Sequence, residues 1–375
     1  MPSITDFLNQ QTRTINRIVD ETFWRLTESQ SVLDGLIPTT SYLTRELFLL
    51  KYQHSRPTIG NVYAEEQEIY NSRTRLTLNT ELISNCKIGK QYTWKGMDFV
   101  EMDRLQNVAF NSYDGADAVR LAIENYFFGR AADLIPAIDS RALLMAINVL
   151  LNGSSTFTDP LTNAQYSLTY ANTSPALLLP ALAGTARWTQ PTTATALTDL
   201  ENHGQAYYNR FGYFPRTLVM RYQMLRDIAN QDATRTAIAQ LRGFPVASGA
   251  PAPAYYYVDD QAVTDLITTR LRGASIVLMD QAYSEEDALG NVVDKYFLPA
   301  NTYFFTEPGL VEKAYVPTVE KDFAPGVFTL AEVVSRLPRV ERVAAVANVI
   351  PFVTDPRKLA SRQVSDLAPN LLVIP

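Results

Sequence analysis

The chain contains very few residues of the two types that most often bind metals. Cys86 is the only cysteine, and His54 and His203 are the only histidines among 375 residues. A single cysteine cannot form an internal disulfide or a metal centre built on several cysteines. The two histidines are far apart and neither belongs to an HExxH pattern. The sequence therefore predicts no metal site, and the lack of disulfides fits folding in a reducing cytoplasm.

Charge is also scarce. Charged residues make up 19% of the chain, and the net charge is −6, whereas globular proteins average about 25% charged residues. An acidic balance argues against a protein whose main task is to grip nucleic acid phosphates. Apolar residues make up 46% of the chain, enough for a sizeable core. A large subunit with so much neutral surface is well suited to self-association, which would cover that surface.

Motifs for phosphate binding and membrane insertion are missing as well. The chain has no GxxxxGK[ST] and no GxGxxG, and Gly89-Lys90 lacks the other required residues. No run of about 18 apolar residues indicates a membrane span. The first residues, MPSITDFLNQQ, are polar and unlike a signal peptide. We therefore expect no phosphate cofactor and no membrane partner, and we interpret the N-x-S/T matches at Asn152 and Asn172 as chance.

Residues that could support acid–base catalysis do not form a convincing set. The acidic groups are Glu65-Glu66, Asp259-Asp260 and Glu285-Glu286-Asp287. Neighbouring residues on a helix or strand point in different directions, so such groups are usually solvated surface. Tyr255-Tyr256-Tyr257 has no interleaved basic residues, which favours an interface or core role over base stacking. The sequence thus predicts no catalytic and no cofactor-binding residues.

The first half of the chain alternates between helical and extended patterns. Residues 73–80 alternate as a strand does, and an extended run over 92–99 follows a polar stretch at 84–90, which together predict a long two-stranded excursion. The other predicted elements are an amphipathic helix over 3–26, a helix over 114–128 that ends near Gly129, a second helix that starts at Pro136 and stops at Asn152-Gly153, and a hairpin over 156–170.

The second half reads as an α/β domain followed by a long strand. The predicted elements are a connection over 180–193, a helix over 194–211, a strand over 217–220, one or two helices in 222–242, a loop at 243–253, a helix over 259–271, a strand over 275–279, an acidic hairpin tip near 284–291 and a strand over 303–305. The valine-rich run 339–353 predicts a buried strand that closes with a turn at 354–356.

Three short segments, in this order along the chain, resemble a known family. They are LLMAINVLLNGSSTF at 143–157, YFLPANT at 296–302 and NVIPFVTDP at 348–356. They are similar to the spine helix with its glycine turn, the FLPxNT strand entry and the closing apolar strand of tailed-bacteriophage major capsid proteins. The resemblance is nearest to the lambda-type family called capsid protein E, whose fold is shared with encapsulins.

The resemblance implies an α+β fold with a characteristic division of the chain. The implied parts are an N-terminal arm over 1–44, an extended E-loop over 45–107, a peripheral domain over 108–178 that contains the spine helix, an α/β axial domain over 179–309, and return strands of the peripheral domain over 310–375. Residues 111–135 are longer and less charged than the family pattern suggests. We see no N-terminal scaffold segment, which favours a separate scaffolding protein.

The function that the resemblance implies is structural rather than enzymatic. The chain would assemble with copies of itself into hexamers and pentamers of an icosahedral or prolate shell that encloses phage DNA, with only non-specific proximity to that DNA. A scaffolding protein, a portal and a decoration protein would be partners. The shell would assemble in the bacterial cytoplasm and form the virion capsid. The expected contact regions are 1–26, 58–100 and 243–256.

Other readings of the sequence stay open. An encapsulin-like compartment would use the same fold around a protein cargo, and a tail or baseplate protein would form rings, tubes or spikes. An enzyme of unrecognised type would depend on residues such as Glu65, Glu66 or His203. In some shells a loop lysine forms an isopeptide bond with an asparagine of a neighbour, and Lys87, Lys90 and Lys95 lie on the predicted excursion.

Overall fold

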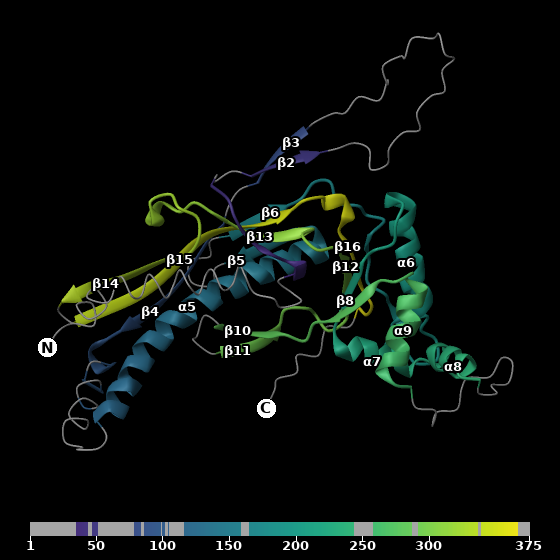
Figure 1. Ribbon diagram of the computed structural model, residues 1–375, viewed down its shortest axis with the longest axis horizontal. Coiled ribbons are helices and arrows are strands. Elements are labelled where there is room, and N and C mark those ends of the chain that lie inside the picture. Colours follow the sequence, from purple (N-terminus) through teal and green to yellow (C-terminus); the bar gives the residue numbers. More distant parts are fainter. Residues whose placement is uncertain are drawn as a thin grey trace, which may run out of the picture. The chain divides into compact units, whose positions relative to one another are not determined.

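A computed structural model describes most of the chain (Figure 1). The described residues are 35–43, 47–51, 79–83, 86–98, 100–101, 104, 116–158, 165–243, 258–286, 292–336 and 339–366. The chain forms two compact units, the first made of 1–47, 84–145 and 312–352 and the second of 48–83, 146–311 and 353–375. The helix predicted over 3–26 and nearly all of the loop predicted at 243–253 lie outside the described residues.

The first unit is built around one long strand, β15. The valine-rich run forms this strand over Arg339–Val353, as predicted. Its side chains alternate, with Val343, Ala345, Ala347 and Val349 buried in one hydrophobic core. The other strands of the sheet are β1 (Thr39–Ser41), β4 (Cys86–Trp94), β13 (Val311–Val316) and β14 (Phe328–Arg336). β4 and β14 both pair antiparallel with β15, and Figure 1 shows β14 and β15 as a long ribbon.

The predicted excursion over 73–99 is wrong in its pairing. The stretch expected to be a polar connection is the first part of β4, which pairs with β15 from Cys86 opposite Val349 to Trp94 opposite Glu341. β3 (Asn79–Ile83) pairs instead with β2 (Leu47–Lys51). Ile88, Tyr92 and Trp94 pack on the core. This packing and the pairing with β15 together stabilise a strand where the local sequence is polar. The extended run also ends sooner than predicted, because residues 96–98 are helical.

The two helices predicted before residue 152 are one. α5 runs without a break over Ala116–Asn152, with Pro136 inside it. A proline in a helix interior costs about 3 kcal/mol, but Leu134, Ile135 and Ile138 are fully buried around it. Each such side chain contributes about 1.5–3 kcal/mol on burial, which offsets the cost. By length and composition alone Leu134–Asn152 could cross a membrane, yet 67% of it is buried inside the protein, as in a core helix.

The second unit contains a five-stranded sheet with helices around it (Figure 1). The strand order is β7 (Leu178–Leu179), β16 (Ala360–Gln363), β12 (Thr302–Thr306), β8 (Thr217–Met220), β9 (Ser275–Leu278), and the helices are α6 (Ala196–Phe211), α7 (Tyr222–Asn230), α8 (Asp232–Leu241) and α9 (Asp260–Arg270). These elements confirm the predicted α/β pattern of 194–305. The described part of the unit also contains three two-stranded sheets, namely β5 (Ser154–Thr158) with β6 (Gln165–Thr169), β10 (Ala282–Glu286) with β11 (Val292–Tyr296), and β2 with β3. The α+β fold class is thereby confirmed.

The predicted stop of α5 at Asn152-Gly153 is also confirmed, and it offers a stability test. Gly153 has φ +67°, and a Cβ there would lie 2.4 Å from Thr173 Cγ2. Gly184 has a similar φ of +61° with nothing within 4 Å. We expect Gly184→Ala to destabilise the fold by about 1 kcal/mol through backbone strain alone, and Gly153→Ala by about 2–4 kcal/mol because the clash adds to the strain. Urea unfolding of both variants measures the difference, and equal losses would contradict the packing argument.

Candidate assembly surfaces

His203 belongs to the core of the second unit. Its side chain is 1% exposed, with Nε2 2.9 Å from the carbonyl oxygen of Leu177 and Nδ1 2.9 Å from the hydroxyl of Tyr303. A carbonyl only accepts, so Nε2 carries the proton and Nδ1 accepts from Tyr303. Burial lowers the pKa of His203 to about 4, with a smaller contribution from Arg362. A neutral imidazole with both nitrogens bonded inside the core stabilises the fold and is not exposed for catalysis.

A second polar cluster in the same unit surrounds Glu307. Tyr207 donates to Oε1 at 2.9 Å, and Lys358 Nζ donates to Oε2 at 3.1 Å. Burial acts to raise the pKa of Glu307, but hydrogen bonds from Tyr213, Lys358 and Tyr207 outweigh it, so the pKa is lowered. The carboxylate is therefore charged and internally satisfied. The cluster ties α6, which carries Tyr207, to the segments that follow β12 and precede β16.

The first unit has a buried ion pair between α5 and β13. Lys313 Nζ lies 2.8 and 2.9 Å from the two carboxylate oxygens of Asp139, and the hydroxyl of Tyr315 lies 3.3 Å from Oδ1. Lys313 is 1% exposed. Burial, followed by the charge of Asp139, raises the pKa of Tyr315. These contacts fix the helix on the sheet, so they stabilise the unit in the same way as the His203 and Glu307 clusters do in theirs.

The acidic groups noted in the sequence have structural partners. Asp259 caps α9 by accepting from the backbone of Ala262 at 2.6 Å, and it pairs with Arg242 at 2.7 Å. The hydrogen bond from Arg242 is the main cause of its lowered pKa. Asp260 pairs with Arg226 at 2.7 Å. Glu285 pairs with Lys295 at 2.7 Å across the β10–β11 hairpin. His54, Glu65, Glu66, Asp287 and Tyr255–Tyr257 lie outside the described residues.

Where the structure describes the chain, no group of three potential metal ligands occurs. Two of the three candidate lysines for covalent crosslinking lie within a sheet rather than on a loop. Lys87 and Lys90 are part of β4 within the sheet of the first unit, and Lys87 pairs with Glu320. Lys95 follows β4 and its backbone N–H donates to Asp98. The premise that Lys87 and Lys90 lie on an excursion is therefore wrong.

One exposed feature of the first unit is the connection between β13 and β14. Phe323 is 63% exposed and Val319 is 56% exposed. Asp322 and Phe323 have φ of 49° and 62°, a left-handed conformation that is uncommon for bulky residues. The N–H of Phe323 donates to Thr318 O at 2.9 Å and stabilises this turn. The sequence contains no signal for this left-handed turn. Residues other than glycine seldom adopt positive φ, and here the contacts around the turn hold Asp322 and Phe323 in that conformation.

A second exposed feature is the β10–β11 hairpin of the second unit. Val292 is 69% exposed, and most residues of β11 are accessible. A two-stranded hairpin is marginal in water by itself. This one is anchored at its base, where the guanidinium of Arg221 stacks 3.6 Å from the ring centroid of Tyr296 and Tyr283 packs 4.8 Å from Phe297. The anchored base leaves two strand edges and an exposed valine as a surface for protein contact.

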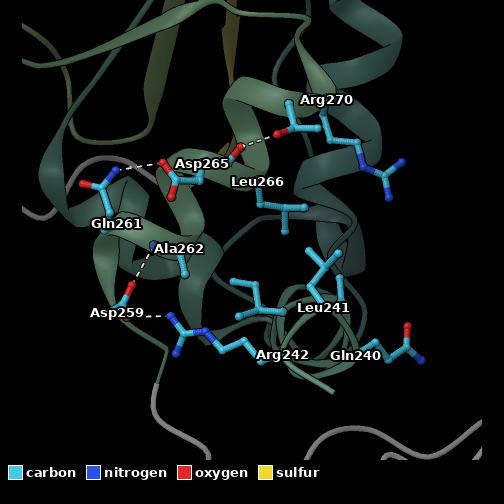
Figure 2. A pocket seen from close by; sticks show the side chains of 12 residues that line it. Gln240, Leu241, Arg242, Asp259, Gln261, Ala262, Asp265, Leu266 and Arg270 are labelled. Atoms are coloured by element: carbon cyan, nitrogen blue, oxygen red, sulfur yellow. Dashed lines mark hydrogen bonds and ion pairs between the residues drawn. The ribbon is translucent and has the colours of Figure 1, made fainter. Parts of the chain in front are cut away.

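A third feature is a groove of about 720 Å³ between α8 and α9 (Figure 2). Ile238 and Leu266 line it and are buried, whereas Leu241 is 74% exposed. Figure 2 shows Leu241 and Leu266 facing the same hollow, with Arg242 joined to Asp259 at its edge. An apolar floor with a charged edge is the usual composition of a protein-binding patch. Sequence reasoning missed this groove, because it depends on how the two helices pack.

The fold of this chain is that of phage capsid proteins, as a comparison with solved structures shows. One similar solved structure is that of a protein named as a capsid protein of a prophage of Escherichia coli CFT073. Its solved structure is similar over 92% of this chain and 98% of its own, with 12% sequence identity and a TM-score of 0.53. The similarity confirms the capsid fold that the sequence resemblance implied.

Two further solved structures are similar at lower scores. A phage-related protein from Bordetella bronchiseptica RB50 matches with 12% identity, 94% of this chain, 98% of its own and a TM-score of 0.45. The capsid of Myoviridae phage XM1 matches with 14% identity, 88% of this chain, 90% of its own and a TM-score of 0.42. No family model matches the chain, and no curated protein matches it. Membership of the lambda-type family and the domain boundaries at 44, 107, 178 and 309 stay predictions.

Proposed function

We propose that this chain is the major capsid protein of a tailed bacteriophage and that it assembles into hexamers and pentamers of a closed shell. One observation carries the proposal, namely that the fold matches a prophage capsid protein over 92% of this chain and 98% of that one. A match almost from end to end means that one fold accounts for nearly the whole of both chains. The proposal includes no enzymatic role.

The physical basis is that different parts of the subunit stabilise its own fold and present surfaces for contact with other copies. The Lys313–Asp139 pair and the His203 and Glu307 clusters stabilise each unit internally. The β13–β14 connection, the β10–β11 hairpin and the α8–α9 groove present exposed apolar side chains instead. Individual contacts through such elements are weak, but repetition around a closed surface makes the assembly stable. Stiff units joined by adaptable contacts suit both five- and six-membered rings.

The same proposal covers partners and location. The net charge of −6 suits a wall that lies near packaged DNA without binding it tightly. The partners that we propose for such a shell are a separate scaffolding protein and a portal, with a decoration protein as a further one. We place assembly in the bacterial cytoplasm and the finished protein in the virion capsid.

Expression of the full chain, alone and with candidate scaffolding proteins, tests the proposal. We expect sedimentation and negative-stain microscopy to show shells or capsomers with fivefold and sixfold symmetry. A monodisperse monomer at high concentration in every condition would refute it. Small uniform shells that contain a protein cargo would instead indicate an encapsulin-like compartment, and rings or tubes would indicate a tail component.

A further inference from the structure

An open edge of the five-stranded sheet in the second unit lies along β9. In the described part of the chain the strand order ends at β9, which pairs only with β8. The backbone N–H groups of Ser275 and Met279 donate to carbonyl oxygens of the segment that forms β8, at 2.8 and 2.9 Å. Because the backbone groups of a strand alternate in direction, those of Ile276 and Leu278 point away from β8. The edge therefore presents donors and acceptors that pair with no other described strand.

β9 carries none of the side chains or bulges that commonly protect a sheet edge. Its sequence, SIVL, has no charged residue and no proline, and its register with β8 runs without a bulge from Ser275 to Leu278. Leu278 is 44% exposed. No residue of β9 is fully buried, whereas all four residues of β8 are buried. The edge thus leaves apolar side chains as well as backbone groups uncovered, which is the composition of a strand-addition site.

Two arginines lie at the end of the sheet where β8 and β9 begin. Arg272 precedes β9, and its guanidinium lies 4.8 Å from the ring centroid of Phe214 and 5.9 Å from that of Tyr208. Arg216 directly precedes β8 and is exposed. Within the described residues neither arginine forms an ion pair. A guanidinium that stacks on aromatic rings keeps its N–H edge available for a carboxylate.

The carboxylates of the neighbouring elements already have basic partners. Glu201 of α6 pairs with Arg270 at 2.9 Å, and Glu307 after β12 pairs with Lys358 at 3.1 Å. Neither carboxylate is left over for Arg272. The start of β9 therefore combines an unpaired backbone edge with a positive charge that the described chain does not neutralise, and its complement is an extended segment with an acidic end.

A second copy of the same edge does not fit this charge pattern. Two β9 strands paired antiparallel about a twofold axis would place each Arg272 beside the residues that follow β9 in the other copy. The carboxylate at that position is Asp280, which already accepts from the guanidinium of Arg221 and from the backbone N–H of Tyr222, both at 3.1 Å. Self-pairing would leave the arginines of both copies without a carboxylate, so a different chain is the better occupant.

We propose that β9 accepts an extended segment of a different protein, in which acidic residues adjoin a short apolar run. The run adds to the sheet through the backbone of Ile276 and Leu278, and the carboxylate binds Arg272. Arg216 adds to the positive potential at that end of the sheet. The four residues of β9 limit the paired stretch to a similar length. This contact goes beyond the proposed shell and does not depend on it, because it uses only residues of the second unit.

Binding of a labelled peptide to the full-length chain tests the proposal. The probe is a synthetic peptide of two aspartates followed by two Val-Thr repeats, and its binding is measured by fluorescence anisotropy. We expect saturable binding and increased protection from hydrogen exchange within residues 275–279. The same peptide with lysines in place of the aspartates should bind about tenfold more weakly. A peptide with N-methylated amides in its Val-Thr run should also bind about tenfold more weakly, because it cannot donate to the edge.

Variants of the chain separate backbone pairing from side-chain packing and from charge. Leu278→Pro removes an outward N–H without breaking a bond to β8, so we expect about tenfold weaker binding. Leu278→Thr is the matched control, since it shortens the apolar side chain but keeps the N–H, and it should bind nearly as well as the wild type. Arg272→Gln should weaken binding about fivefold. Arg104→Gln, at an arginine of the first unit that is 74% exposed, should have no effect.

Five outcomes would overturn the proposal and leave the capsid function untouched. Absence of saturable binding, or equal binding of the N-methylated peptide, would exclude strand addition, and both results come from the wild-type chain whether or not Leu278→Pro folds. Equal binding of the lysine peptide would exclude the carboxylate contact. Dimerisation of the chain that Leu278→Pro abolishes would show that the edge serves a second copy. A short DNA duplex that displaces the peptide and requires Arg272 would show a phosphate-binding surface instead.

Discussion

Replacing Asp139 with alanine is expected to destabilise the first unit by about 3–5 kcal/mol, because it removes the carboxylate that forms the ion pair with the buried Lys313 ammonium. The ammonium lies 2.8 Å from Asp139 and is 1% exposed. Such burial keeps bulk solvent away from the ammonium, so solvation does not compensate for the lost carboxylate. Urea unfolding of the wild-type chain and of the variant, under conditions where each stays unassembled, measures the loss.

A double variant gives the matched control. In Asp139→Leu with Lys313→Met both charges are replaced by apolar side chains of similar size, and we expect the stability to return to within about 2 kcal/mol of the wild type. The difference between the single and double variants isolates the cost of the unpaired charge from that of changed packing. A double variant as unstable as the single one would show that the hydrogen bonds of this cluster, including that of Tyr315, matter more than its charge balance.

The second large effect concerns acid stability of the second unit. The pKa of His203 is about 4 in the folded protein and 6.5 without the fold. As the pH falls below 6.5, His203 becomes protonated in the unfolded chain. In the folded chain it stays neutral until about pH 4. The contribution of His203 to stability is therefore complete above pH 6.5 and is lost between pH 6.5 and 4. The loss reaches about 3 kcal/mol, at about 1.4 kcal/mol per pKa unit.

His203→Gln is the matched variant for this test. Its side-chain amide can donate to Leu177 O and accept from Tyr303, yet it does not titrate. We expect the wild type to lose about 3 kcal/mol more than this variant between pH 7 and pH 4 in urea unfolding. Carboxylates, including nearby Asp199, which pairs with Arg362 at 3.6 Å, are present in both proteins and cancel in the comparison. Parallel pH profiles would contradict the burial argument.

These clusters bear on function because a shell subunit has to keep its shape while its contacts differ. Each cluster links elements from distant parts of the sequence, such as Asp139 with Lys313 and His203 with Tyr303. Polar groups satisfied inside a low-dielectric core specify one arrangement of those elements, because any shift leaves a donor or charge unpaired.

The amino-acid sequence by itself determined the elements whose pattern is local. The helices and strands between residues 194 and 305, the strand over 339–353 and the helix end at Gly153 all follow from apolar spacing or from a glycine with positive φ. The three segments at 143–157, 296–302 and 348–356, in that order along the chain, were also enough to indicate the capsid fold, which the similarity to a solved structure confirms.

Tertiary structure decided the rest, and the reason is the same in each case. The polar segment at 86–90 forms a strand because its backbone pairs with β15. α5 continues through Pro136 because the apolar side chains next to this proline are buried. The pairing of Lys313 with Asp139, the left-handed turn at Phe323 and the groove between α8 and α9 likewise depend on groups far apart in the chain. Local periodicity reports which side of an element is apolar, whereas the free energy of each of these features comes from partners that only the folded chain brings together.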